Sequence, residues 1–312
     1  MNSPDLSIVS PVYLGEPCVD ELVEGIRSTI ETFTPNFEII LVEDGSPDGS
    51  WGKIREQCEK DPRIKGIRLS RNFGQHQAIT AGLSAARGKR VALLDCDLQD
   101  DPKYLKDLYQ KSLEGFDVVL TKKSARAHPP LKNFFAFLFS LIFNQLIDDR
   151  NYKMNTDVGV YSMITRKVVD AFLRVNDYQR HYLTILRWLG FSSVTIPVEH
   201  RQRPYGKSSY TLRKILNHGL DGIVSQSDKL LYLSVQIGFL FFILSTFSIL
   251  YLVTRYFFLS RPLEGWTSLM VLVLFSTGLI LMSLGILGIY LGKTFDQVKA
   301  RPLFLIDERL NA

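Results

Sequence analysis

The stretch RVALLDCDLQDDP (residues 90–102) changes from apolar to acidic within a few positions, and it indicates the kind of fold to expect. Val91–Leu94 is a short apolar run of the kind found in buried strands. Four aspartates then fall within the seven positions from Asp95 to Asp101. Carboxylates this close repel one another, so positive charge is expected beside them.

The chain before and after this stretch alternates between strand-like and helix-like segments. Each strand-like segment is short, rich in β-branched residues and almost continuously apolar, as in a parallel sheet covered by helices on both faces. The predicted strands are 6–10, 37–44, 64–70, 90–95 and 116–121. The predicted helices lie near 18–32, 50–60, 74–87 and 102–114. We therefore expect an α/β domain with a mainly parallel sheet, in which ligands bind beyond the carboxyl ends of the strands.

The acidic loop after residue 94 has two interpretations. Asp95 and Asp97 alternate at a strand end, and Gln99 continues on the same side if the backbone stays extended. Oxygen ligands of this kind suit Mg²⁺ or Mn²⁺, which complete their coordination with water and phosphate oxygens. Asp100 and Asp101, directly before a proline, are expected instead to serve the start of the next helix.

A second acidic loop, VEDGSPDGS (42–50), follows the second predicted strand. Gly45 permits a tight turn there. We expect Asp48 to cap the following helix and Asp44 to accept hydrogen bonds from a nucleobase or ribose. No GxGxxG motif follows the first predicted strand, so a dinucleotide fingerprint is absent.

The second half of the chain contains two long segments without a formal charge, Leu230–Thr254 and Trp266–Leu291. At 1.5 Å per residue each exceeds the roughly 30 Å hydrocarbon core of a bilayer. Basic residues precede and follow the pair. This pattern predicts a C-terminal two-helix transmembrane hairpin, with the α/β domain and both termini cytoplasmic.

The segment LKNFFAFLFSLIFNQLI (131–147) is apolar but too short to span a membrane. It fits either a core helix or an interfacial helix lying among lipid headgroups. The overall charge of +5, from 37 basic and 32 acidic residues, suits an anionic membrane surface or a phosphorylated substrate. Nucleic acid is not an expected partner. The three cysteines have no metal-type spacing and are expected to be reduced thiols, and no signal peptide is expected.

Several motifs in order resemble the family-2 glycosyltransferases, specifically the polyprenyl-phosphate branch that includes dolichyl-phosphate mannose synthase and bactoprenol glucosyltransferase. The resemblance rests on segments spread over almost the whole chain: SPVYLGE (10–16), VEDGSPDGS (42–50), LSRNFGQHQAITAGLSAARG (69–88), LLDCDLQDDP (93–102), TDVGVYSMITRKVV (156–169), HRQRPYGKSSYTLRKI (200–215) and YLGKTFDQVKARPLFLI (290–306). It implies a GT-A fold, a Rossmann-like arrangement that takes a nucleotide-sugar donor, with Mg²⁺ or Mn²⁺ as cofactor.

The resemblance also implies roles for residues in the first two loops. Pro11, Tyr13 and Glu16 match the family's first nucleotide-contacting loop, and Asp44 matches its base-contacting aspartate. The sequence departs from the family at Leu14–Gly15, where relatives usually have Asn-Glu after the tyrosine.

Asp95, Asp97 and Gln99 match the family's metal and diphosphate motif, and Asp97 is expected to be essential for catalysis. Asp157 stands where the family places its candidate base. A lipid phosphate acceptor is already mostly ionised near neutral pH and hardly needs a strong base. Asp157 is therefore expected mainly to orient the acceptor.

The stretch RQRPYGKSSY (201–210) resembles a family segment that contacts donor and acceptor phosphates. Arg203 and Ser208 match it, and a guanidinium grips phosphate through two parallel hydrogen bonds. The family's lysine is replaced by Ser209. Either Lys207 substitutes for it or one phosphate contact is lost.

The expected function is inverting, metal-dependent transfer of one sugar from a nucleotide-sugar, by family usage a UDP-sugar, to a polyprenyl phosphate such as undecaprenyl phosphate. The alternatives are another lipid acceptor such as diacylglycerol, or a catalytically silent lipid-carrier binding protein. Relatives imply a homo-oligomer, a tetramer. The expected domains are a glycosyltransferase domain (1–229, with an interfacial helix at 131–147 and a juxtamembrane helix at 211–229), the transmembrane pair (230–291) and a cytoplasmic tail (292–312).

Overall fold

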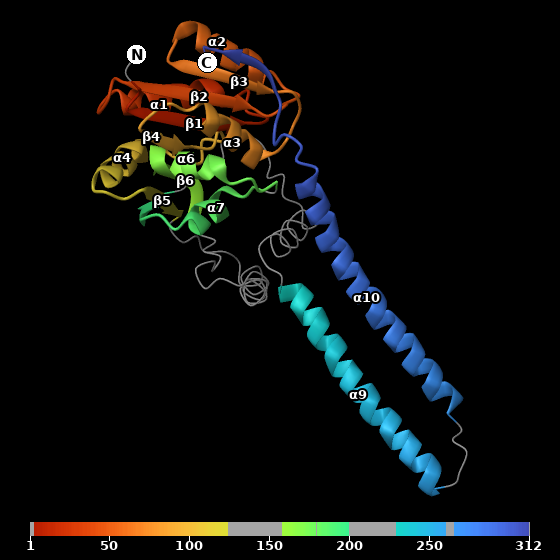
Figure 1. Ribbon diagram of the computed structural model, residues 1–312. Helices are drawn as coiled ribbons and strands as arrows, with labels where there is room; N and C mark the ends of the chain where they lie inside the picture. The colour runs from red at the N-terminus through yellow and green to blue at the C-terminus, as the bar shows by residue number, and fades with distance from the viewer. Residues whose placement is uncertain (1–2, 124–157, 179, 200–228, 260–264, 312) are drawn as a thin grey trace. The chain divides into compact units, whose positions relative to one another are not determined.

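The computed structural model describes residues 3–123, 158–178, 180–199, 229–259 and 265–311 (Figure 1). The chain divides into two compact units. The first contains the described residues up to 199 together with 301–311, and the second contains 229–259 and 265–300. Each unit is described by itself below.

The first unit is built on one sheet whose described strands follow the order β7-β5-β6-β4-β1-β2-β3-β8. Their bounds are β1 Leu6–Val12, β2 Phe37–Glu43, β3 Ile64–Leu69, β4 Arg90–Leu93, β5 Val118–Lys123, β6 Val158–Thr165, β7 Ser193–Val198 and β8 Ile306–Leu310. Strand β1 is parallel to β2 and β4, β2 is parallel to β3, and β5 is parallel to β7. Strand β6 is antiparallel to β4 and β5, and β8 is antiparallel to β3. The predicted mainly parallel sheet is confirmed, with antiparallel partners that the sequence did not predict.

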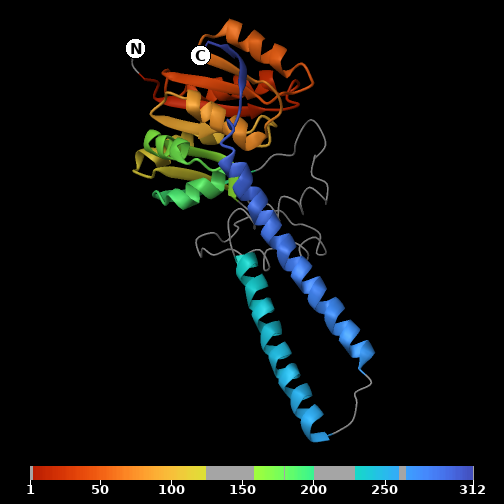
Figure 2. The same cartoon turned by 45° about the vertical axis from the view of Figure 1, so that its right-hand side comes forward.

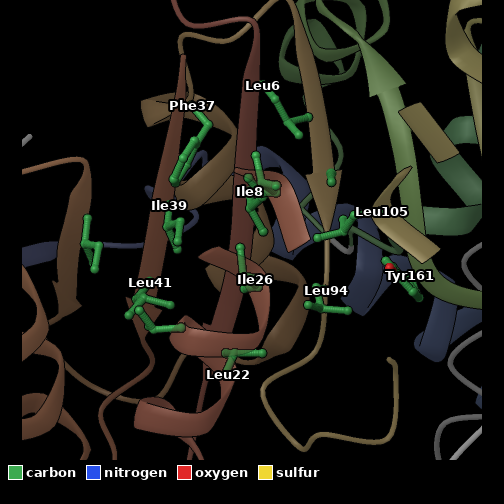
Figure 3. Close-up of a cluster of buried hydrophobic side chains, with 14 of the residues drawn as sticks. Leu6, Ile8, Leu22, Ile26, Phe37, Ile39, Leu41, Leu94, Leu105 and Tyr161 are labelled. Atoms are coloured by element: carbon green, nitrogen blue, oxygen red, sulfur yellow. The ribbon is translucent and has the colours of Figure 1, made fainter. Parts of the chain in front are cut away.

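Helices cover both faces of this sheet (Figure 1). They are α1 Val19–Ile30, α2 Ser50–Lys60, α3 Gln75–Ala85, α4 Leu105–Leu113 after the short 3₁₀ turn η1 Pro102–Tyr104, α6 Arg166–Arg174 and α7 Tyr182–Leu189. Every residue of β1 and β2 is buried, and successive side chains point to opposite faces. Ile8 therefore packs with Leu22 and Ile26 of α1, as Figure 3 shows, whereas Val9 joins the second core cluster with α3.

The C-terminal residues form an unexpected edge strand of the sheet (Figure 2). Strand β8 pairs with β3, and just before β8 the carbonyl of Leu305 accepts Ser70 N–H at 2.9 Å. Asn311 Nδ2 donates to backbone oxygens of Cys58 and Ile64 at 2.8 and 2.9 Å. The end of the segment expected to be a cytoplasmic tail is thus part of the first unit.

The second unit contains two long helices, α9 Lys229–Leu259 and α10 Trp266–Val298, which lie side by side in Figures 1 and 2. The rings of Phe241 and Phe275 are 5.0 Å apart. Among the described residues, one helical segment, Phe275–Val298, is long and apolar enough to cross a membrane, with a mean hydropathy of 1.8. The expected transmembrane pair is corrected accordingly, because the apolar stretch within the described part of α9 is Leu231–Phe241, about 16 Å long and shorter than a membrane core. The segment 131–147 lies outside the described residues.

Two glycines allow a test of how α3 packs on the sheet. A Cβ at Gly82 of α3 would lie 2.3 Å from Cγ1 of Val9, which is fully buried in β1. We expect Gly82→Ala to lower the free energy of unfolding by roughly 1–3 kcal/mol, the cost of overpacking a core. Gly52 of α2 has no neighbour within 4 Å, so Gly52→Ala is expected to raise stability by about 0.5–1 kcal/mol. Denaturant unfolding of the purified variants measures both, and equal effects would contradict the packing.

Candidate active site

The loops that follow β1, β2, β3 and β4 lie at one edge of the sheet, because these strands are parallel. They contain residues 13–18, 44–49, 70–74 and 94–101. Most of the site residues predicted within the described chain belong to these loops. Pro11 is the exception, since it lies buried within β1. It lies beyond Val9, where the pairing with β4 ends, so its missing N–H is tolerated.

The first and second loops are joined by hydrogen bonds between backbone amides and polar side chains. The donor and acceptor pairs are Leu14 N to Ser46 Oγ (2.8 Å), Gly15 N to Ser50 Oγ (3.1 Å), Glu16 N to Asp48 Oδ2 (3.2 Å) and Gly49 N to Glu16 Oε2 (2.9 Å). Glu16 therefore holds the turn before α2, and Tyr13 beside it is 46% exposed. Their contact with a nucleotide stays a prediction.

Asp48 organises the start of α2, which confirms its predicted role. Its Oδ1 accepts hydrogen bonds from Ser50 N at 3.2 Å and from the hydroxyls of Ser46 and Ser50 at 2.5 Å each. Burial alone would raise the pKa of Asp48, but these bonds outweigh it and the pKa is lowered. The carboxylate is therefore held in its ionised form, next to the helix N-terminus that favours negative charge.

Asp44 fastens the third loop to the second. Its side chain is buried, and its two oxygens accept Phe73 N at 2.7 Å and Gly74 N at 2.9 Å. Gly45 adopts φ +59°, and a Cβ there would lie 2.3 Å from the backbone of Arg71 and Asn72. Desolvation raises the pKa of Asp44, opposed by the two amide donors. This loop-fixing role was missed by sequence reasoning, and the predicted nucleobase contact stays a prediction.

The fourth loop is anchored by a leucine in a strained backbone conformation. Leu98 has φ +58° and yet is only 8% exposed, packed in the core with Leu22 and Leu105. Burial of its side chain compensates for a left-handed conformation that bulky residues disfavour. Asp97 and Gln99 flank this anchor and are partly exposed, and Gln99 N donates to Asp97 Oδ1 at 3.1 Å.

Asp95 also contacts the first residue of α3, because Gln75 Nε2 donates to its Oδ1 at 2.8 Å. Between the two aspartates, desolvation raises the pKa of the Cys96 thiol to about 12, so it is protonated at neutral pH. A Cβ at Gly15 would lie 3.3 Å from this sulfur and 2.8 Å from Cγ1 of Val12. This close packing leaves no room for a side chain at position 15.

The side chains of Asp95, Asp97 and Gln99 fit a divalent cation by their chemistry. Two carboxylates and an amide are hard oxygen donors, which Mg²⁺ and Mn²⁺ prefer, with the remaining positions left to water and phosphate. Among the described residues, no group of three or more His, Cys, Asp or Glu side chains has a metal-binding arrangement. The predicted set contains two acids, so a cation bound there would need oxygens of water or phosphate to complete its coordination.

Asp101 serves the helix start, as predicted. Its Oδ1 accepts Lys103 N at 3.1 Å, capping the 3₁₀ turn that begins at Pro102. Its carbonyl accepts the hydroxyl of Tyr161 at 3.2 Å, which connects the loop to β6. The remaining predicted site residues, Asp157, Arg203, Lys207 and Ser208, lie outside the described residues.

Glu43, the last residue of β2, contacts the second loop, and the sequence analysis did not identify it as a site residue. It is 1% exposed; Ser46 N–H donates to Oε1, and Arg68 Nε lies 3.6 Å from Oε2. An acid as the last residue of a buried strand could have been recognised as unusual. Gln75 gave no such signal, because nothing in the sequence relates it to Asp95.

The comparisons with known proteins agree with this geometry. The family model described as glycosyl transferase family 2 matches residues 7–173. The chain is 33% identical to the uncharacterized glycosyltransferase YkcC of Bacillus subtilis (strain 168), over 97% of this chain and 93% of that protein. It is 30% identical to an undecaprenyl-phosphate 4-deoxy-4-formamido-L-arabinose transferase of Enterobacter sp. (strain 638), over 96% and 92% of the two chains.

These matches define an α/β glycosyltransferase, and the chain belongs to glycosyl transferase family 2. Among solved structures, the fold is similar to the mannosyl-3-phosphoglycerate synthase of Rubrobacter xylanophilus. The TM-score is 0.51 at 16% identity, covering 71% of this chain and 72% of that one. This likeness supports the GT-A-like arrangement of the sheet.

Leu14 provides a test of strain in the first loop. It adopts φ +52° and is 52% exposed, so no burial compensates for its left-handed backbone. We expect Leu14→Asn to raise the free energy of unfolding by about 0.5–1 kcal/mol, because asparagine tolerates this conformation better. Leu113→Asn, at an exposed position that ends α4, is the control and should lower stability slightly. If both substitutions changed the free energy of unfolding equally, the left-handed backbone at Leu14 would not be destabilising.

The buried Glu43 predicts a pH-dependent difference in stability. Desolvation raises its pKa, opposed by the Ser46 amide and Arg68, so the folded state binds this proton more tightly than the unfolded chain. That stabilisation is present below the unfolded pKa and is lost as pH rises through the folded pKa. We expect Glu43→Gln to unfold at a higher temperature than the wild type at pH 7, and the gap to close toward pH 4. The exposed Glu21→Gln is the control, and a gap that widens on acidification would contradict the assignment.

Proposed function

We propose that this glycosyltransferase transfers one sugar, with inversion, from a nucleotide-sugar to a polyprenyl phosphate at a membrane surface. The observation that carries the proposal is the near full-length similarity to undecaprenyl-phosphate 4-deoxy-4-formamido-L-arabinose transferases. The acidic loop after β4 supports it, because its carboxylates are oxygen ligands suited to a divalent cation, which would in turn neutralise the negative charge of a donor diphosphate.

On this proposal the donor lies over the loops after β1, β2 and β4. Tyr13 and Glu16 would contact the nucleotide from the first loop, and Asp44 from the second. Asp95, Asp97 and Gln99 would hold Mg²⁺ or Mn²⁺ against the diphosphate. A divalent cation bound there would neutralise the negative charge that develops on the departing nucleoside diphosphate.

The acceptor on this proposal is a lipid phosphate, whose ionised oxygen attacks the sugar carbon as the bond to the diphosphate breaks. Such an oxygen needs little help from a base near neutral pH. Asp157 would orient the acceptor, and Arg203, with Lys207 and Ser208, would bind phosphate groups. Diacylglycerol would be a different case, since its hydroxyl must lose a proton and would need Asp157 as a true base.

Membrane association would come through α10, whose segment Phe275–Val298 carries exposed apolar side chains. Strand β8 follows α10 and lies in the same sheet as β1–β7. On this proposal the sheet, with both β1 and β8, would lie on the cytoplasmic side of the membrane.

The test is transfer by the purified, folded protein supplied with undecaprenyl phosphate, Mg²⁺ or Mn²⁺ and a panel of nucleotide-sugars. Mass spectrometry of the lipid is expected to show the gain of one sugar residue, and EDTA is expected to prevent it. No gain with any donor would favour the silent binding protein. Gain on added diacylglycerol alone would replace the proposed acceptor.

Asp97 provides the sharpest substitution for this reaction. Asp97→Ala is expected to reduce transfer by at least about 100-fold, the scale of losing a group that stabilises transition-state charge. The fold should persist, because the substitution also relieves repulsion in the acidic loop. Asp107→Ala, an exposed aspartate in the first turn of α4, is the matched control and should keep full activity. Substantial transfer by Asp97→Ala would remove this residue from the cation site.

A further inference from the structure

The segment 70–75 contacts both acidic loops of the site. Its backbone amides at Phe73 and Gly74 hold the two oxygens of Asp44. Directly after Gly74, the side chain of Gln75 donates to Asp95 Oδ1 at 2.8 Å. The segment therefore joins the loop expected to bind the nucleotide to the loop expected to bind the cation.

The backbone that carries Gln75 is held firmly on both sides. Gly74, the N-cap residue of α3, has φ +109°, a conformation that L side chains rarely adopt. Beyond Gln75 the helix is fixed on the sheet, since Ala78 and Ile79 are buried and Gly82 packs closely on Val9. The side chain of Gln75 is itself exposed. Its hydrogen bond to Asp95 is therefore a contact of the site rather than part of the core.

We propose that Gln75 is a positioning residue that orients the Asp95 carboxylate for the divalent cation. The inference rests on the proposed function. A neutral amide suits this task, because it holds a carboxylate oxygen by hydrogen bonding without a positive charge that would compete with the cation. Partners that orient a metal ligand typically account for about 10–100-fold in metal affinity or activity.

Two substitutions test this role, one by removing the hydrogen-bond donor to Asp95 and one by replacing it with a positive charge. Gln75→Met keeps the length of the side chain but removes the donor. Gln75→Lys places an ammonium group beside Asp95, where it would partly neutralise the carboxylate. The matched control is Gln110→Met, at an exposed glutamine of α4 away from the acidic loop.

The primary measurement is Mn²⁺ binding to the purified full-length protein with UDP present, from the EPR signal of free Mn²⁺ and corrected with a protein-free sample. We expect Gln75→Met to raise the Kd for Mn²⁺ about 10-fold and Gln75→Lys to raise it further. Gln110→Met should match the wild type, and all three variants should unfold at the wild-type temperature. Transfer at saturating Mn²⁺ should recover toward the wild-type rate in Gln75→Met.

Each contrary result has a distinct meaning. Unchanged Mn²⁺ affinity in both Gln75 variants would overturn the inference, as would a wild type that binds no Mn²⁺. A raised KM for the nucleotide-sugar with unchanged Mn²⁺ affinity would overturn it in favour of direct contact with the donor. A wild type that binds Mn²⁺ but transfers no sugar would reject the proposed function, while the Kd comparison would still decide the role of Gln75.

Discussion

The buried carboxylate of Asp44 determines how the loops of the site meet. A carboxylate removed from water is stable only where donors replace its hydration, and here the amides of Phe73 and Gly74 do so at 2.7 and 2.9 Å. Gly45 lets the turn approach the backbone of the third loop, which a side chain would prevent. Because this contact fixes the residues before α3, it also fixes where Gln75 lies relative to Asp95.

Strained backbone also occurs at this edge of the sheet. Leu14 and Leu98 adopt left-handed backbone conformations in the first and fourth loops. Such residues persist only where their surroundings over-determine them, and they are common at functional sites. The two cases differ in compensation, since Leu98 buries its side chain in the core and Leu14 is 52% exposed. The buried side chain of Leu98 therefore anchors the acidic loop to the core.

The C-terminal strand makes the sheet depend on residues far away along the chain. Trp51 Nε1 of α2 donates to Glu308 Oε2 at 3.0 Å, across 257 positions. Arg55 forms an ion pair with the same glutamate, and Arg68 of β3 lies 3.7 Å from Asp307. Charged residues on an edge strand also discourage pairing with other chains. Strand β3 leads into the loop held by Asp44, so the tail supports the side of the sheet that carries the site.

The sequence by itself determined the α/β class and the positions of the strands and helices in the first 114 residues. It also determined the local roles of Asp48 and Asp101. Apolar runs and helix caps depend on residues that are neighbours along the chain, so both can be recognised without the tertiary structure. The sequence also marked Asp95, Asp97 and Gln99 as a group. Only the tertiary structure decided that β6 and β8 run antiparallel, that Asp44 binds amides 29 and 30 positions away, and that Gln75 reaches Asp95 across 20 positions. A hydrophobic pattern records that a strand is buried, but its partners, their direction and the contacts between loops arise only when the chain closes on itself.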